Sequence, residues 1–335
     1  MRRQEQVSLK RYNTFGVEAT ARSVVQIESE TDLEELEFDP RRDLVLGGGS
    51  NVLFTGDVDG TVFINRIGGM RVIDSDDDMA VVEAAGGAIW HSLVLWSLKQ
   101  GLSGLENLSL IPGLAGAAPM QNIGAYGVEL ADYLDSVTAW DWQNREWVNF
   151  SNHDCSFSYR DSRFKSDEPD RYLITSMRLR LRRNFTPSLS YAGLNEELAA
   201  LGIEKPSADL VSKAVILIRK RKLPNPATLG NAGSFFKNPS LHPDQAEKLR
   251  TRFDGLPVHM INKGAVKLSA AWMIEHCGWK GHREGDAGVF EKHALVLVNH
   301  GNASGRDILS LANKISASVA EEFGVTLEPE PRIIA

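Results

Sequence analysis

The sequence predicts an α+β protein of two or three domains. Its 335 residues are enough to form more than one hydrophobic core. Hydrophobic residues make up 42% of the chain and charged residues 24%, which is ordinary for a globular protein. Short β-branched runs occur among segments of helical apolar periodicity, and three runs between residues 137 and 181 predict an antiparallel sheet.

The first 70 residues predict a strand, a short helix and further strands. Thr31 and Glu34 have the spacing of a capping box, which predicts that a short helix begins there. The strands are expected at residues 22–28, 43–46, 52–54 and 61–64. The second of these runs directly into residues 47–52, which we call the first glycine turn.

Residues 70–205 predict a mixed region. A strand at 79–84 precedes Gly86, and a helix over 89–100 ends before Gly101, which suits a left-handed residue after the last turn. The strands of the antiparallel sheet are expected at residues 137–141, 146–150 and 172–181. Between the helix and this sheet lies a long stretch without strand or helix periodicity.

The remainder of the chain predicts more helices. A helix over 209–218 carries the basic run 219–222 at its C-terminal end, where cations are favourable, and Pro224 ends it. Further helices are expected at 244–252, 270–277 and 304–323, with a buried strand at 294–299.

Composition argues against several classes of function. The net charge is −7 and the basic run 219–222 contains no aromatic residues, which disfavours binding to nucleic acid or anionic membranes. Apolar runs such as 294–298 are too short to cross a bilayer, and residues 1–6 do not lead into the apolar part of a signal peptide. Cys155 and Cys277 lack metal-ligand spacing, so we expect no metal and a cytoplasmic protein.

The most informative segment is residues 111–127, which we call the glycine loop. It has no charged side chain, four glycines and four alanines, and Pro112 and Pro119 argue against a helix or a ladder strand. Small side chains allow close approach of the backbone, and free amides bind anions without Lys or Arg. A pyrophosphate site is one interpretation; a tight structural loop is the other.

The first glycine turn offers a second anion-binding candidate. It does not match the dinucleotide fingerprint of a Rossmann fold, because Val52 stands where the third glycine belongs and no long helix follows. A P-loop is also excluded, because the turn lacks the Lys that follows the last glycine of that motif. Two such turns suit a dinucleotide such as FAD held between two lobes.

Together these motifs resemble those of the UDP-N-acetylmuramate dehydrogenases, also called UDP-N-acetylenolpyruvoylglucosamine reductases, of the subtype with an additional tyrosine loop. The resemblance rests on the first glycine turn and the glycine loop, and on four further segments: residues 13–16, 157–162, 230–239 and 327–330. It implies a two-lobed FAD-binding fold of the vanillyl-alcohol oxidase type with a smaller α/β substrate-binding domain. The implied domains are residues 1–68 with 326–335, residues 69–205, and residues 220–325.

The implied reaction is the NADPH-dependent reduction of UDP-N-acetylglucosamine enolpyruvate to UDP-N-acetylmuramate through FAD, in bacterial peptidoglycan precursor synthesis. Hydride addition leaves negative charge next to a carboxylate, so the substrate needs a cation and a proton donor. The resemblance assigns Arg160 to the carboxylate, where one well-placed donor is worth ~3–4 kcal/mol. Ser234 is the implied proton donor, and Glu330, Lys237 or Asn238 could support it; burial should raise the pKa of Glu330.

The resemblance also implies the binding residues. For FAD they are Gly47, Gly48, Gly49, Ser50, Asn51, Val52, Pro112, Gly113, Gly116, Gln121, Asn122, Ile123, Gly124, Tyr126, Gly127 and Arg332. The substrate residues are Tyr191, Arg219, Lys222 and Asn238. The first glycine turn contains no His or Cys, so we expect FAD to be non-covalent.

Other functions remain compatible with the sequence. A flavin oxidase or dehydrogenase of the same fold would act on another substrate, and a nucleotide-sugar-binding protein would have no redox activity; an RNA-binding protein is disfavoured by charge. We expect a monomer, although the residues leave the oligomeric state open. The residues also do not determine whether NADPH or NADH is preferred, whether ions regulate the protein, or which residues contact each phosphate of FAD. The role of Lys292 and His293 is open as well.

Overall fold

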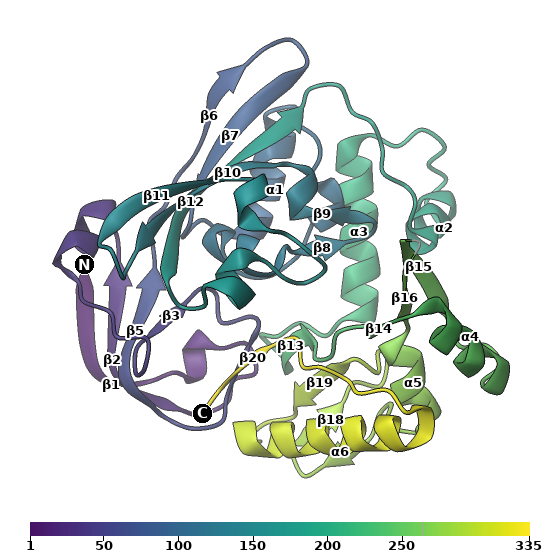
Figure 1. Ribbon diagram of the computed structural model, residues 1–335. Helices are drawn as coiled ribbons and strands as arrows, with labels where there is room; N and C mark the ends of the chain where they lie inside the picture. Colours follow the sequence, from purple (N-terminus) through teal and green to yellow (C-terminus); the bar gives the residue numbers. More distant parts are fainter. Residues whose placement is uncertain (263) are drawn as a thin grey trace. The chain divides into compact units, whose positions relative to one another are not determined.

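The computed structural model describes residues 1–262 and 264–335. The chain forms two compact units that are interleaved along the sequence (Figure 1). Unit 1 comprises Met1–Val7, Ala21–Gly48 and Val58–Arg221, and unit 2 comprises Ser8–Thr20, Gly49–Asp57 and Lys222–Ala335. The first glycine turn therefore contributes its first two glycines to unit 1 and its remaining residues to unit 2.

The first sheet of unit 1 has the strand order β1-β2-β5-β3. Its strands are β1 (Arg2–Ser8), β2 (Thr20–Ile27), β5 (Val58–Asn65) and β3 (Leu44–Leu46). Both β2 and β3 run parallel to β5. One face buries Val25, Ile27 and Phe63 against Trp140 and Trp142, which explains why these strands are rich in β-branched and aromatic residues.

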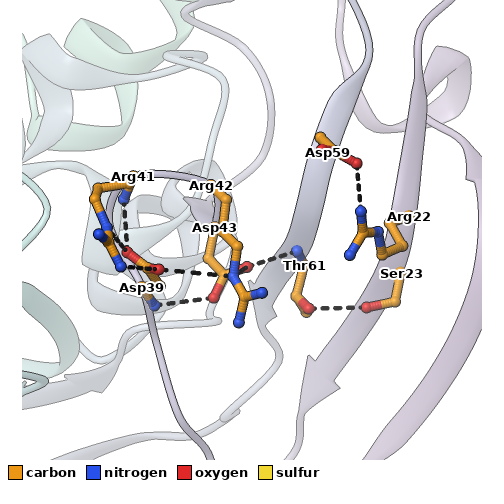
Figure 2. Close-up of polar contacts among 8 residues, drawn as sticks. All are labelled: Arg22, Ser23, Asp39, Arg41, Arg42, Asp43, Asp59 and Thr61. Carbon is orange, nitrogen blue, oxygen red and sulfur yellow. Dashed lines mark hydrogen bonds and ion pairs between the residues drawn. The ribbon is translucent and has the colours of Figure 1, made fainter.

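A network of polar side chains stabilises one end of this sheet (Figure 2). The Asp43 carboxylate accepts from the amide of Thr61 at 2.8 Å and from that of Asp39 at 2.9 Å, so it joins β5 to the turn before β3. Ser23 and Thr61 hydroxyls lie 2.9 Å apart across β2 and β5. This network fixes the direction in which β3 enters the first glycine turn.

The short helix after β2 has a different cap from the one that the sequence predicts. A 3-10 helix spans Glu30–Glu35, and its capping box is formed by Ser29 and Asp32 instead of Thr31 and Glu34. The Asp32 carboxylate reaches back to the Ser29 amide at 3.1 Å, which places the start of the helix two residues earlier.

The second sheet of unit 1 is antiparallel with the order β11-β10-β12-β7-β6, and its strands β10, β11 and β12 are the three that the sequence predicts. Its strands are β6 (Met70–Ser75), β7 (Met79–Ala85), β10 (Leu134–Asp141), β11 (Glu146–Ser151) and β12 (Tyr172–Arg182). Helix α1 (Trp90–Lys99) follows β7. Strands β1 and β6 were not predicted from the sequence. Both are exposed edge strands, and without a buried face they show no alternation of apolar and polar residues.

Two helices complete unit 1. Helix α3 (Ala208–Lys222) confirms the helix expected before Pro224, and α2 (Ala192–Ala200) was not expected. They share a small core of Leu194, Leu198, Val211, Ala214, Val215 and Ile218. Two short strands, β8 (Gly124–Ala125) and β9 (Val128–Glu129), pair at the end of the glycine loop.

Unit 2 contains a four-stranded sheet of order β13-β19-β18-β17. Its strands are β13 (Gly230–Ser234), β19 (Val296–Asn299), β18 (Ala287–Val289) and β17 (Arg283–Glu284), and β14 (Ser240–Leu241), β16 (Ala265–Leu268) and β15 (Val258–Asn262) form a second sheet. The helices are α4 (Pro243–Arg252), α5 (Ala270–His276) and α6 (Gly305–Phe323). Helix α6 contacts β18 and β19, begins at the Ser304 cap and ends at Gly324 with φ +67°, as its sequence predicts.

The C-terminal strand returns to the first glycine turn. Strand β20 (Arg332–Ile334) pairs in parallel with β4 (Val52–Phe54), so residues about 280 apart in sequence are neighbours within unit 2. Short 3-10 helices lie at Lys10–Tyr12, Glu106–Leu108, Ala115–Ala117, Pro119–Gln121, Leu130–Asp132 and His153–Cys155, and a π-helical turn lies at Arg163–Asp167. Among the described residues, no helix is both long and apolar enough to cross a membrane.

Candidate functional site

The glycine loop is held by the segment that leads into α1. The amide of Trp90 donates to the carbonyl of Gly113 at 3.1 Å, and the amide of Gly116 donates to the carbonyl of Gly86 at 2.8 Å. The loop is mostly irregular as expected, but it contains two single 3-10 turns and the short strand β8. Pro119 opens the second turn, a position that needs no amide donor.

Glycines of the first glycine turn and of the glycine loop pack backbone against backbone in unit 1. A Cβ atom on Gly48 would lie 2.8 Å from the Cα of Gly113, and one on Gly47 would lie 3.0 Å from the Cβ of Ala117. A Cβ on Gly116 would lie 2.7 Å from the Ile174 carbonyl oxygen. This close packing explains the small residues in both segments and suits a cradle made of peptide amides.

The rest of the first glycine turn belongs to unit 2. Gly49 has φ +62°, and a Cβ there would lie 1.8 Å from the carbonyl oxygen of Tyr12, so only glycine fits. Asn51 accepts a backbone hydrogen bond from Arg332 at 3.0 Å and donates its side-chain amide to the carbonyl of Glu330 at 3.3 Å. Three of the predicted site residues, Asn51, Glu330 and Arg332, are thus brought together.

Asn122 stabilises the end of the glycine loop from inside unit 1. It is buried with φ +44°, its Nδ2 atom donates to Glu129 at 2.8 Å, and its Oδ1 atom accepts from the amide of Ala131 at 3.0 Å. Gln121 and Ile123 flank it in the same turn. The side chain of Asn122 therefore stabilises the conformation of the loop.

Arg160 lies in a tight turn beside the same loop. It has φ +56°, and its Nη2 atom donates to the carbonyl of Gly124 at 2.7 Å. The neighbouring Asp161 accepts from the Ser162 amide and the Ser166 hydroxyl. The left-handed backbone of Arg160 is uncommon for a residue with a side chain, and such strain concentrates at functional sites.

Arg219 lies in the last turn of α3, close to Arg160. Burial lowers the pKa of Arg219, and the nearby charge of Arg160 lowers it further, while polar contact with the Tyr126 hydroxyl acts in the opposite direction. Its Nε atom is buried and has no hydrogen-bond partner. A buried guanidinium next to a second guanidinium is costly unless an anion binds there, so this part of unit 1 fits an anionic ligand.

Ser234 stands at an irregularity in β13. The pairing register with β19 shifts between Asn231 and Ser234, Gly233 adopts φ +72°, and its amide donates to the Asn231 side chain at 2.9 Å. A bulge of this kind changes the direction in which a side chain points. The next residue, Phe235, accepts from the backbone amide of Glu330 at 2.8 Å, so Ser234 and Glu330 lie on adjoining segments of unit 2.

The two other groups that could support Ser234 are engaged elsewhere. Lys237 lies 3.3 Å from Glu328, and the Oδ1 atom of Asn238 accepts from the amide of Ala270 at 3.0 Å, at the start of α5. Glu330, the third alternative, lies on the segment whose backbone pairs with Phe235, the residue after Ser234.

The remaining substrate-binding candidates are distributed between the units. In unit 1, the Tyr191 ring is 42% exposed and packs edge-to-face on the Tyr126 ring, with centroids 5.0 Å apart. In unit 2, Lys222 is exposed. Burial lowers the pKa of His293, and the positive charge of Lys222 lowers it further. The Nδ1 atom of His293 accepts from the amide of Leu295 at 3.3 Å.

Two residues that the sequence analysis missed support the glycine loop. The Nδ1 atom of His91 accepts from the amide of Leu110 at 3.0 Å, and the side chain of Asn107 donates to the carbonyl of Tyr126 at 2.8 Å. Neither residue lies in a recognisable motif, so no local pattern could have identified them. Among the described residues, no group of His, Cys, Asp and Glu is arranged to hold a metal ion.

Comparison with known proteins agrees with this geometry. Residues 225–334 match the family described as UDP-N-acetylenolpyruvoylglucosamine reductase, C-terminal domain, and residues 22–151 match an FAD binding domain. The reductase of Pseudomonas putida is 48% identical over 334 residues and 98% of each chain is covered. The reductase of Xanthomonas euvesicatoria is 51% identical, with 98% of this chain and 95% of that protein covered.

The chain belongs to the UDP-N-acetylenolpyruvoylglucosamine reductase family. The reductase of Thermus caldophilus, a solved structure of this family, aligns with a TM-score of 0.71 at 26% identity over the full length of both chains. A solvent-stable cholesterol oxidase aligns with a TM-score of 0.50 at 12% identity, covering 97% of this chain and 86% of that one, which shows a shared fold alone. The expected family and the expected FAD-binding fold class are therefore confirmed.

Proposed function

We propose that the chain reduces UDP-N-acetylglucosamine enolpyruvate to UDP-N-acetylmuramate with NADPH, using bound FAD, in bacterial cell-wall precursor synthesis. The observation that carries this proposal is the identity of about half of all residues with reductases of that name over nearly the whole chain. The chain is an FAD-dependent oxidoreductase by the same relationship and by its FAD binding domain.

The residues of both glycine segments fit a flavin dinucleotide. Gly48 and Gly113 approach so closely that a side chain on Gly48 is excluded, and the glycine loop has no charged side chain to compete for the amides. Bound FAD would accept a hydride from NADPH and pass it to the substrate. The proposed contacts with FAD come from the first glycine turn, the glycine loop and Arg332, without a covalent bond.

Arg160 and Arg219 are the proposed partners of the enolpyruvyl carboxylate. Burial lowers the pKa of Arg219, and the neighbouring charge of Arg160 lowers it as well. A bound anion would offset both effects. A guanidinium can donate two parallel hydrogen bonds to a carboxylate, and the same donors would stabilise the negative charge that develops next to it.

Ser234 is the proposed proton donor to the carbon next to the carboxylate. Its hydroxyl is a weak acid, but the carbon carries enolate-like charge and is a strong base. The bulge at Gly233 sets the direction of Ser234, and the pairing of Phe235 with Glu330 places a carboxyl group on the adjoining segment. Glu330 would support the developing alkoxide by hydrogen bonding.

The remaining proposals concern the nucleotide part of the substrate and the setting of the enzyme. Tyr191, Lys222 and Asn238 would bind the diphosphate, Lys222 as a point charge and Tyr191 as a cover. The domain limits stated above stay a prediction, as do a monomer, a cytoplasmic location and the use of NADPH as co-substrate. Acid precipitation should release all of the FAD into the supernatant if it is non-covalent.

The decisive experiment separates the two half-reactions of the Ser234→Ala variant by stopped-flow absorbance. NADPH should still bleach the flavin at the unmodified rate, because Ser234 takes no part in that step. Reoxidation by the enolpyruvyl sugar should slow by at least ~10²-fold, the usual contribution of a positioned acid. Equal slowing of both half-reactions would remove Ser234 from the role of proton donor.

A further inference from the structure

Asn107 is a fully buried amide that connects two distant segments of unit 1. Its side chain is 0% exposed. The Nδ2 atom donates to the Tyr126 carbonyl at 2.8 Å and to the Ser188 carbonyl at 2.9 Å. These acceptors lie 19 and 81 residues away along the chain, so both hydrogens of one amide join the end of the glycine loop to residues 185–191, which we call the Tyr191 segment.

On one side of this bridge, Tyr126 and Gly127 form the turn between the paired strands β8 and β9. Tyr126 has φ +52° and Gly127 has φ +80°, and a Cβ on Gly127 would lie 2.5 Å from the Ser190 hydroxyl oxygen. The Tyr191 segment is irregular up to the start of α2. The fully buried Asn107 side chain is one of the contacts that hold the two segments together.

The bridge ends at the two tyrosines that form an edge-to-face pair. Tyr126 carries one accepting carbonyl, and Tyr191 follows the other by three residues; their rings are 5.0 Å apart at an angle of 79°. Tyr191 is 42% exposed, and Asn107 holds the carbonyl of Ser188 three residues before it, so Asn107 restrains the segment that carries the Tyr191 ring. Ordering an irregular segment in advance lowers the entropic cost of binding.

We propose that Asn107 is a positioning residue for substrate binding, which holds the Tyr191 segment against the glycine loop. This inference rests on the proposed role of Tyr191 in covering the nucleotide diphosphate. As a positioning residue, Asn107 would act on the substrate through Tyr191. Loss of its two donors leaves the carbonyls of Tyr126 and Ser188 without this partner, which would release the Tyr191 segment from the glycine loop.

The test is a double-mutant cycle on the FAD-loaded enzyme, with UDP-N-acetylmuramate as the probe. Its Kd is measured from the change in flavin absorbance for the unmodified chain, Asn107→Leu, Tyr191→Ala and the double variant. Asn107→Leu should raise the Kd about tenfold, which corresponds to ~1.4 kcal/mol, and it should add little in the Tyr191→Ala background. Asn107→Ser, which keeps one donor, should have an intermediate effect.

A matched control distinguishes this role from general stability. Asn152 also donates its Nδ2 atom to two carbonyls of unit 1, those of Ala131 and Leu134, each at 2.8 Å. Asn152→Leu should lower the Tm by a similar amount and leave the Kd unchanged. If Asn152→Leu weakens binding as much as Asn107→Leu does, the inference is wrong.

The outcomes separate the inference from the proposed function. If Tyr191→Ala leaves the Kd unchanged, the proposed role of Tyr191 fails and the inference fails with it. If Tyr191→Ala weakens binding but the effects are additive, only the inference fails. If both Asn107 variants fail to fold or lose FAD in step with binding, Asn107 is a structural residue and the inference is overturned.

Discussion

The imidazole of His91 holds Leu110 in a left-handed conformation at the entrance of the glycine loop. Its Nδ1 atom accepts from the Leu110 amide at 3.0 Å, and Leu110 has φ +59°. A backbone of this kind is unfavourable for leucine and persists only where the surroundings enforce it. Because Nδ1 is the acceptor, the bond requires that this nitrogen carry no proton.

Acid should therefore weaken the unit that contains His91. Burial, and after it the charges of Arg219 and Lys220, lower the pKa of His91 below its ordinary value of 6.5. Below pH 6.5 the unfolded chain takes up a proton that the folded chain rejects, so stability falls as the pH falls from 6.5 towards the folded pKa. His293 and His300, which belong to unit 2, should give that unit the same trend, because burial also lowers the pKa of each.

The measurement is the Tm between pH 8 and pH 5. His91→Asn keeps an acceptor near the Nδ1 position but does not titrate, so its Tm should fall less steeply below pH 6.5. His153→Asn serves as the control, because the His153 side chain is fully exposed. An identical acid slope for the unmodified chain and His91→Asn would contradict the prediction.

Gly48→Ala should abolish tight binding of FAD. The new Cβ would lie 2.8 Å from the Cα of Gly113. Because a backbone atom cannot move aside as a flexible side chain can, the two glycine segments must separate. Overpacking of this kind costs about 1–3 kcal/mol, which would raise the Kd for FAD by about 5-fold to 150-fold. The readout is flavin content after purification and the Kd from fluorescence titration.

Gly68→Ala is the matched control for that variant. Its nearest neighbour would be the Arg66 carbonyl oxygen at 3.9 Å, an ordinary van der Waals contact. We expect normal flavin content and a Tm that is unchanged or slightly higher, because alanine restricts the unfolded chain. Similar loss of FAD in both variants would mean that the close approach at Gly48 is unimportant.

Arg219→Met should separate stability from function. The substitution removes a buried guanidinium whose Nε atom has no partner, so the Tm of the ligand-free protein should stay equal or rise. The KM for the enolpyruvyl sugar should increase by about tenfold or more, since a charged hydrogen bond to the carboxylate is lost. Lys213→Met, at an exposed position of the same helix, should change neither quantity appreciably.

Glu106→Gln should stabilise the protein at neutral and alkaline pH. Glu106 is 2% exposed, burial raises its pKa, and its Oε2 atom accepts from the amide of Gly104 at 2.7 Å. The folded chain holds this proton more tightly than the unfolded chain, so the contribution of the carboxyl to stability is complete below pH 4.5 and is lost as the pH rises through the folded pKa. Glutamine keeps the acceptor without the charge.

The Tm difference between Glu106→Gln and the unmodified chain should therefore be small near pH 4.5 and grow with pH. A difference of about 2 °C or more at pH 8 would match the loss of ~1 kcal/mol. A difference that is independent of pH would show that the Glu106 carboxyl stays protonated, or stays paired, throughout the range.

Much of the architecture could be predicted from local patterns. Helix α6 was predictable because its apolar stripe, its Ser304 cap and its closing Gly324 agree with one another. Strands β10, β11 and β12 of the antiparallel sheet were predictable from their β-branched runs. The exposed strand β6 and helix α2 were missed, because an edge strand and a short helix bury too little to impose a period.

By itself, the sequence determined which segments carry the chemistry: two uncharged glycine segments, a small polar residue in a turn, and the family that combines them. Only the tertiary structure decided that Asn107 contacts Ser188, 81 residues away, that His91 supports Leu110, and that Arg219 lies beside Arg160. The physical reason is that periodicity and turn chemistry act over a few residues. A buried hydrogen bond or the proximity of two charges depends on positions that only the folded chain brings together.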